Sequence, residues 1–230
     1  MNLISEMFSY NFAVRALIAG LLISLCASVL GVNMVLKRFS MLGDGLSHVA
    51  FGAAAVALAI GAAPLKIAIP VVIIAAFLLL RISSSTKIRG DAAIAMVSSG
   101  ALAIGVIVAT LTTGMNTDIN NYMFGSILAI SKNDVWTAAI VAACVLAVYI
   151  LFYNKIFACA FDERFAEAVG VNVRLYNSIL AVLTAVTVVI GMRIMGALLI
   201  SSIMTFPALS AMRVCKRYRT TVAVSAAISE

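Results

Sequence analysis

Charged residues are scarce in this chain, because Asp, Glu, Lys and Arg make up only 11% of its 230 positions. Soluble domains carry roughly a quarter of their residues as charges, so this is not the sequence of an ordinary water-soluble protein. Lys and Arg outnumber the acidic residues and give a net charge of +7. They are scattered in short groups between apolar runs rather than gathered on one face, which argues against nucleic acid as a partner.

Catalytic motifs are also missing. The sequence has no GxxxxGK[ST] loop for nucleotide phosphates and no recognisable pairing of a nucleophile with a base. We therefore expect no enzymatic activity and no bound cofactor, so that any ATP that drives this protein is hydrolysed by another chain. None of the four cysteines forms a CxxC pair, which argues against a disulfide framework and a structural zinc site.

Hydrophobic residues, in contrast, fill 64% of the chain, and many runs approach the roughly 20 residues that cross a bilayer. The sequence predicts an all-α, polytopic transmembrane bundle that forms one domain over residues 1–230. An eighth span begins near Thr220, but the remaining 11 residues are about half of a span, so we expect the chain to be truncated there. The seven predicted full spans are Ala13–Leu36, Asp44–Ile60, Leu65–Leu80, Ala92–Thr113, Val135–Phe152, Leu175–Ile190 and Ile194–Met212.

The breaks between the spans predict the orientation. Twelve of the 16 Lys and Arg residues fall in alternate breaks, at 37–40, 81–91, 154–174 and 213–219. The positive-inside rule makes these breaks cytoplasmic and places the amino terminus outside, in the cell membrane of a prokaryote. On the outer side, the apolar stretch Phe124–Ile130 is too short to cross and is predicted to form a re-entrant or surface-lying helix.

Asp44 and His48, in GDGLSHVAF, are the most informative pair of residues. A spacing of four places both side chains on one face of a helix, where one cation can bridge them. Imidazole together with carboxylate suits zinc, manganese or iron rather than sodium or calcium. The alternatives are that Asp44 only caps the helix and that His48 is a hydrogen-bonded packing residue.

A charged segment, FDERFAEAVGVNVRLYN (Phe161–Asn177), interrupts the apolar runs on the predicted cytoplasmic side. Short helices of this kind dock into grooves on partner proteins, and a surface of Ala166, Ala168 and Gly170 favours that interpretation. The alternative is an ordinary solvated loop helix.

A second unusual stretch, Gly196–Arg213, carries Pro207 among small and hydroxyl residues. Such residues allow membrane helices to approach closely and to satisfy the backbone groups that a proline frees. Close helix packing explains most of this stretch, and Met204 is a weaker candidate for a soft metal ligand.

Four segments occur in an order that resembles one family. They are MVLKRFSMLGDGLSHVAFG (Met34–Gly52), FGSIL with the following Asp134, the charged segment after Phe161, and MGALLISSIMTFPALSAMR, which ends at Arg213. From about Ala13 to the last residue, the chain resembles the integral-membrane permeases of zinc and manganese (also iron) ATP-binding-cassette importers. Members of that family continue beyond the helix that begins here at Thr220.

The resemblance implies a function and a set of partners. Two permease chains would pair around a central pathway within the lipid bilayer, two ATPase chains would bind beneath them, and an extracytoplasmic metal-binding protein would dock above. Zinc is the first expected cargo, with manganese or iron next. Asp44 and His48 match the family's metal-contacting pair. The residues that match its coupling helix are Phe161, Asp162, Glu163, Ala166, Glu167, Ala168 and Gly170.

Two other functions remain open from the residues alone. Asp44 and His48 could relay protons in an ion-coupled secondary metal carrier, a role that intramembrane ionisable pairs do serve. Alternatively, the pair could hold helices together in a membrane scaffold that transports nothing.

Overall fold

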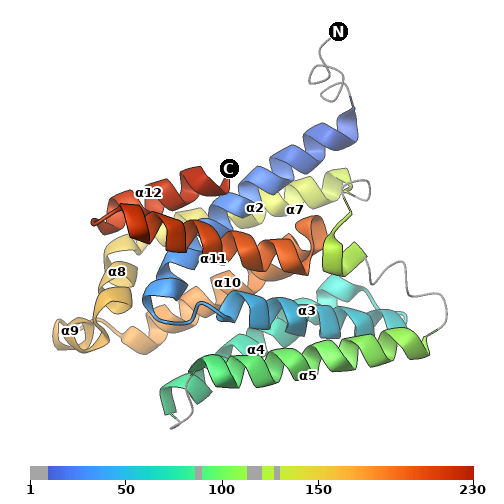
Figure 1. Ribbon diagram of the computed structural model, residues 1–230, viewed down its shortest axis with the longest axis horizontal. Coiled ribbons are helices and arrows are strands. Elements are labelled where there is room, and N and C mark those ends of the chain that lie inside the picture. Colours follow the sequence, from blue (N-terminus) through green and yellow to red (C-terminus); the bar gives the residue numbers. More distant parts are fainter. Residues whose placement is uncertain (1–9, 86–89, 113–120, 127–129) are drawn as a thin grey trace.

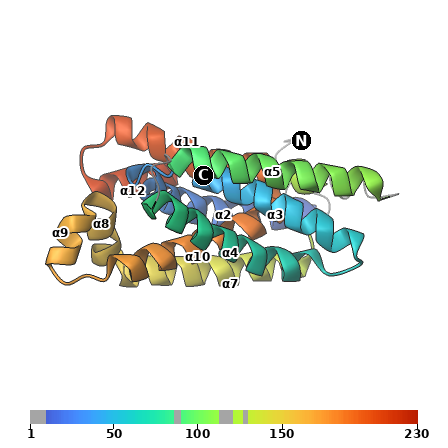
Figure 2. The ribbon, with the colours of Figure 1, turned by 90° about the horizontal axis from the view of Figure 1, so that it is seen from below.

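The computed structural model describes residues 10–85, 90–112, 121–126 and 130–230, and the regular structure within these ranges is α-helical. Seven helices of this described part are long and apolar enough to cross a membrane, which confirms the predicted all-α membrane bundle. Figure 1 shows the spans packed side by side, and Figure 2 shows an elongated bundle with the short helices α8 and α9 at one end.

The seven spans lie within a few residues of their predicted positions. One boundary differs, because the break expected around Arg193 falls at Gly196 instead. Gly196 has φ +91°, a backbone conformation that glycine adopts readily, whereas Arg193 lies in the last helical turn, where the helix dipole favours a cation. The spans are α2 (Asn11–Leu36), α3 (Leu42–Ala59), α4 (Pro64–Ser85), α5 (Gly90–Leu111), α7 (Lys132–Leu151), α10 (Val173–Met195) and α11 (Ala197–Val214).

Three shorter helices complete the described part, namely α8 (Tyr153–Phe161), α9 (Glu163–Ala168) and α12 (Tyr218–Ser229). The sequence did not predict α8 as a separate helix, because its nine residues are too few to cross a bilayer and lie mostly in the predicted break 154–174. Helix α12 begins two residues before the predicted Thr220 and is shorter than a span. Within the predicted outer helix Phe124–Ile130, residues 127–129 lie outside the described part, and the helical turn 121–124 ends at Phe124.

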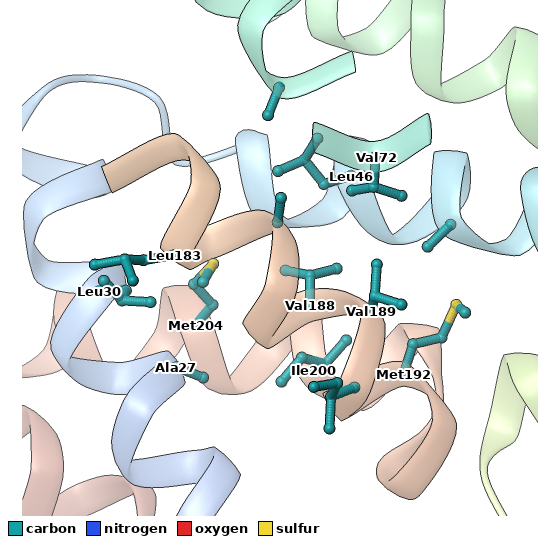
Figure 3. Close-up of a cluster of buried hydrophobic side chains, with 14 of the residues drawn as sticks. Ala27, Leu30, Leu46, Val72, Leu183, Val188, Val189, Met192, Ile200 and Met204 are labelled. Carbon is teal, nitrogen blue, oxygen red and sulfur yellow. The ribbon is translucent and has the colours of Figure 1, made fainter. Parts of the chain in front are cut away.

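The core surrounds α10, which packs against α2, α3, α4, α7 and α11. Figure 3 shows apolar side chains from α2, α3, α4, α10 and α11 gathered in one cluster. Between membrane helices the attraction is mainly van der Waals packing, so small residues that permit close approach matter most. Gly31 illustrates this on α2, because a Cβ atom there would lie only 1.9 Å from the Met204 carbonyl oxygen of α11.

A buried polar network fixes α12 against the bundle. The hydroxyl of Tyr218 donates to Asn33 Oδ1 at 2.7 Å and lies 2.6 Å from the Tyr149 hydroxyl, which also accepts from Asn33 Nδ2 at 3.3 Å. Asn33 is fully buried. The network joins α2, α7 and α12, and each buried polar group in it has a partner, as burial requires.

Candidate metal pathway and docking segment

Asp44 and His48 lie in the first two turns of α3, directly after the tight turn that links α2 to α3. The residue that caps α3 is Met41, which makes no side-chain capping bond. The carboxylate of Asp44 is directed to His48 instead, with Oδ1 at 3.5 Å from Nε2. Asp44 is therefore not the helix cap that one interpretation of the sequence suggested.

The distance between these two atoms suits a shared metal ion. Zinc binds imidazole nitrogen and carboxylate oxygen at about 2.0–2.2 Å in tetrahedral geometry, which places two such ligand atoms about 3.4 Å apart. The observed separation is 3.5 Å. The separation matches that of two ligands of one zinc ion, and it is equally the distance of a direct contact between carboxylate and imidazole.

The surroundings of the pair combine access with an unsatisfied nitrogen. The Asp44 side chain is 41% exposed and the His48 side chain is 14% exposed, so the carboxylate is the more accessible group. His48 Nδ1 is buried without a hydrogen-bond partner. A packing histidine and a histidine that binds metal through Nε2 would both normally have a partner for Nδ1, so this nitrogen does not distinguish the two roles.

Helix α11 supplies the adjacent wall. The Ser201 side chain donates to the Leu198 carbonyl at 3.1 Å and lies near the Asp44 carboxylate. The Met204 sulfur would lie 2.6 Å from a Cβ atom added at Gly43. Met204 is buried between Gly31 and Gly43, which fits the packing role of this stretch. Within the described ranges, no group of three His, Cys, Asp or Glu residues could hold a metal.

The segment that starts at Phe161 presents an apolar face away from the bundle. Asp162 caps α9 by accepting hydrogen bonds from the backbone N–H groups of Arg164 and Phe165, at 2.9 and 3.1 Å. Phe161, Phe165 and Val169 are 78%, 62% and 64% exposed, and we call these three residues the docking face. Large exposed apolar residues of this kind mark a surface that binds another protein or the membrane.

The predicted small-residue surface of this segment is only partly correct. Ala168, Gly170 and Glu167 are exposed, but Ala166 is fully buried. The reason is local, because Ala166 lies on the side of α9 that faces the bundle, and the chain then turns at Gly170, which has φ +83°. Ala166 therefore supports the segment from within.

Glu163 is also directed toward the bundle. Its Oε1 atom accepts from Lys37 Nζ at 2.8 Å and from Asn177 Nδ2 at 3.1 Å, and Lys37 Nζ also donates to Asn177 Oδ1. Burial alone would raise the pKa of the Glu163 carboxyl, but these hydrogen bonds and the Lys37 charge outweigh it and hold that pKa below its ordinary value. Sequence reasoning treated Lys37 only as a topological charge.

An ion pair at the opposite end of the bundle was not predicted from the sequence. Arg193 Nη2 lies 3.1 Å from Asp134 Oδ1, and Asp134 also accepts from the backbone N–H of Ser131 in a capping box. The pair borders a cavity of about 180 Å³ that Asn121, Tyr122, Ser126, Ile130 and Ile194 also line. The capping box is visible in the sequence as S-x-x-D, but the pairing with Arg193 is not.

Known proteins share both the sequence pattern and the fold. The manganese import system permease protein ScaB of Streptococcus parasanguinis is 31% identical over 88% of this chain and 72% of that protein. The high-affinity zinc uptake system membrane protein ZnuB of Haemophilus influenzae is 30% identical over 86% of this chain and 76% of that protein.

A solved structure, PsaBC from Streptococcus pneumoniae in complex with Fab, contains a chain with the same fold. It superposes with a TM-score of 0.85 at 27% identity and covers 98% of this chain and 81% of that one. The profile of the ABC 3 transport family matches residues 9–230, and the chain therefore belongs to this family of multi-span membrane permeases.

Proposed function

We propose that this chain is the permease subunit of an ATP-driven importer that carries zinc or manganese, with Asp44 and His48 as the metal-contacting pair. The observation that carries this proposal is the 3.5 Å separation of His48 Nε2 and Asp44 Oδ1, two donor atoms on one face of α3. The names of the relatives, one a manganese and one a zinc permease, support both metals. Carboxylate and neutral imidazole are suitable donors for either ion.

The proposed partner proteins supply what one permease chain lacks. Two donors leave a four-coordinate metal incomplete, and a second copy of the permease would supply the same pair across a shared pathway. The docking face at α9 would enter a cleft of the cassette ATPase, because apolar side chains exposed to water gain from being covered there. An extracytoplasmic metal-binding protein would deliver the cargo at the opposite end.

The orientation follows from the basic residues that gather near α9. Lys37 pairs with Glu163, Lys155 lies over the ring of Tyr176, and Arg219 lies over the ring of Tyr153. The positive-inside rule makes this end cytoplasmic. The amino terminus of α2 is then outside, in the cell membrane of a prokaryote.

Transport requires the site to bind and then release the ion. Asp44 supplies a negative charge that offsets the charge of the cation, and neutral His48 supplies a nitrogen lone pair. Because both donors of one chain come from α3, a movement of α3 relative to the second copy changes how many donors the cation has. ATP hydrolysis on the partner would drive this movement through α9.

The test is metal uptake by cells that carry the ATPase and the binding protein, with radioactive zinc and manganese. Asp44→Asn and His48→Gln, at matched membrane abundance, should each abolish uptake of the cargo metal. Asp91→Asn is the matched control, since Asp91 also lies in the first turn of a span but outside this site. Normal transport by both site variants would contradict the proposal, and loss of one metal alone would name the cargo.

A second experiment, in membrane vesicles, separates the proposal from a secondary carrier. A proton relay through Asp44 and His48 would sustain metal uptake in vesicles that lack ATP and respond to an imposed pH gradient. An ATP-driven permease stops without ATP and is indifferent to that gradient.

A further inference from the structure

A cluster of three polar side chains joins the end of α2, the start of α9 and the second turn of α10. Lys37 donates to Glu163 Oε1 at 2.8 Å and to Asn177 Oδ1, and Asn177 Nδ2 donates to the same Glu163 oxygen at 3.1 Å. Each member contacts the other two. We call Lys37, Glu163 and Asn177 the α2–α9 cluster.

The charge of Lys37 is unusual in its setting. Its side chain is only 5% exposed, and lysine is almost never buried unless it is paired. Its amine donates hydrogen bonds to both other members of the cluster. Lys37 is also the residue at which α2 ends. Because separation from Glu163 would leave a buried charge without its counter-ion, Lys37 and Glu163 are expected to move together.

The chain runs from Lys37 directly into the metal-contacting pair. Asp44 follows after a turn in which Arg38 has φ +62°, a conformation that non-glycine residues adopt only when their surroundings hold them. The Phe39 N–H donates to the Met34 carbonyl at 2.8 Å, and Thr205 Oγ1 of α11 lies 3.4 Å from the Ser40 carbonyl. A short, hydrogen-bonded turn of this kind carries a displacement of Lys37 into the first turn of α3.

We propose that Lys37 is a positioning residue that transmits the movement of α9 to the Asp44 and His48 site through Glu163. This inference rests on the proposed function. It adds that different residues of the segment that starts at Phe161 have different roles. Phe161, Phe165 and Val169 face outward and bind the ATPase, whereas the half-exposed Glu163 is bonded to Lys37 and passes the movement on. Loss of the cluster therefore uncouples ATP hydrolysis from transport without releasing the ATPase.

The test uses the complete transporter, with ATPase and binding protein, reconstituted in liposomes. Lys37→Met and Glu163→Gln remove the ion pair, and Arg164→Gln removes a neighbouring exposed charge as the matched control. Three quantities are measured, namely co-purification of the ATPase, the ATPase rate, and metal taken up per ATP. A coupling interaction typically changes a linked equilibrium by 5–150-fold, so uptake per ATP should fall about tenfold in both variants and stay at the wild-type level in the control.

A charge reversal provides the rescue. The Asn177 amide both donates and accepts hydrogen bonds, so it can serve a reversed pair equally well. The double variant Lys37→Glu with Glu163→Lys should recover most of the uptake per ATP that either single reversal loses. Phe165→Ser, on the docking face, should instead lose the ATPase, which shows that the assay detects failed docking.

Three results would overturn the inference. Normal uptake per ATP in Lys37→Met and Glu163→Gln would show that the cluster transmits nothing. Loss of the ATPase from both variants would show that the cluster serves docking. If the double reversal does not recover more uptake per ATP than the single reversals, the cluster only stabilises the fold. If the wild-type assembly itself transports neither zinc nor manganese with ATP, the proposed function fails, independently of the cluster.

Discussion

Replacing Gly31 by alanine should displace α11 from α2 and so disturb the wall of the metal site. A Cβ atom at residue 31 would lie 1.9 Å from the backbone oxygen of Met204 and 2.9 Å from its carbonyl carbon. Backbone atoms cannot move aside as the end of a flexible side chain can. The two helices must therefore separate, and Met204 and Ser201 shift away from Gly43 and Asp44.

Comparison with a second glycine isolates the loss of stability that the new contact at residue 31 causes. Gly100 also lies within a span, on α5, and a Cβ atom there would meet no atom within 4 Å. Both substitutions remove the cost of glycine within a helix, about 1 kcal/mol, so this gain cancels when the two variants are compared. What remains is the overpacking cost at residue 31, about 1–3 kcal/mol.

The assay is the thermal stability of each purified permease variant, followed by its metal uptake in the reconstituted transporter. Gly31→Ala should unfold at a lower temperature than Gly100→Ala and should transport less per folded molecule. Gly43→Ala should lie between them, because its new Cβ would meet only the Met204 sulfur, 2.6 Å away near the end of a movable side chain. Equal stability of the Gly31 and Gly100 variants would refute the close approach of α2 and α11.

Acid should weaken metal capture, because protons compete with the metal for its ligands; uptake that does not change as the pH falls would argue against His48 as a ligand. The carboxyl of Glu163 has a pKa below its ordinary value of 4.5, so its contribution to stability is complete above that value and is lost as the pH falls through the lowered pKa. Stability measured from pH 7 down to 3 should therefore fall less steeply at the acid end in Glu163→Gln than in the wild type. Asn33→Leu leaves the hydroxyls of the buried Tyr149 and the half-buried Tyr218 without their amide partner, at about 1–3 kcal/mol, and should increase hydrogen exchange in α12 while exchange in α5 stays the same. Arg193→Gln leaves the nearly buried Asp134 carboxylate without its counter-ion and should lower thermal stability more than Lys132→Gln, which removes an exposed charge.

The sequence by itself determined the features that depend on neighbouring residues. A bilayer demands a continuous run of apolar residues, so the seven spans follow from composition alone. The facing of Asp44 and His48 follows from the helical repeat, which brings residues four apart onto one face. The expected start of a further helix near Thr220 also depends only on residues that are close together in the sequence.

Only the tertiary structure decided which distant groups meet. Lys37 and Glu163 are 126 residues apart in the chain. From the sequence, Lys37 was explained as a charge that sets the topology and Glu163 as part of a docking helix, so neither residue required a distant partner. The burial of Ala166 and the pairing of Arg193 with Asp134 depend in the same way on how helices pack side by side. How closely two helices approach depends on the fit of side chains across the whole bundle. A single sequence predicts such contacts only between residues that are also close along the chain.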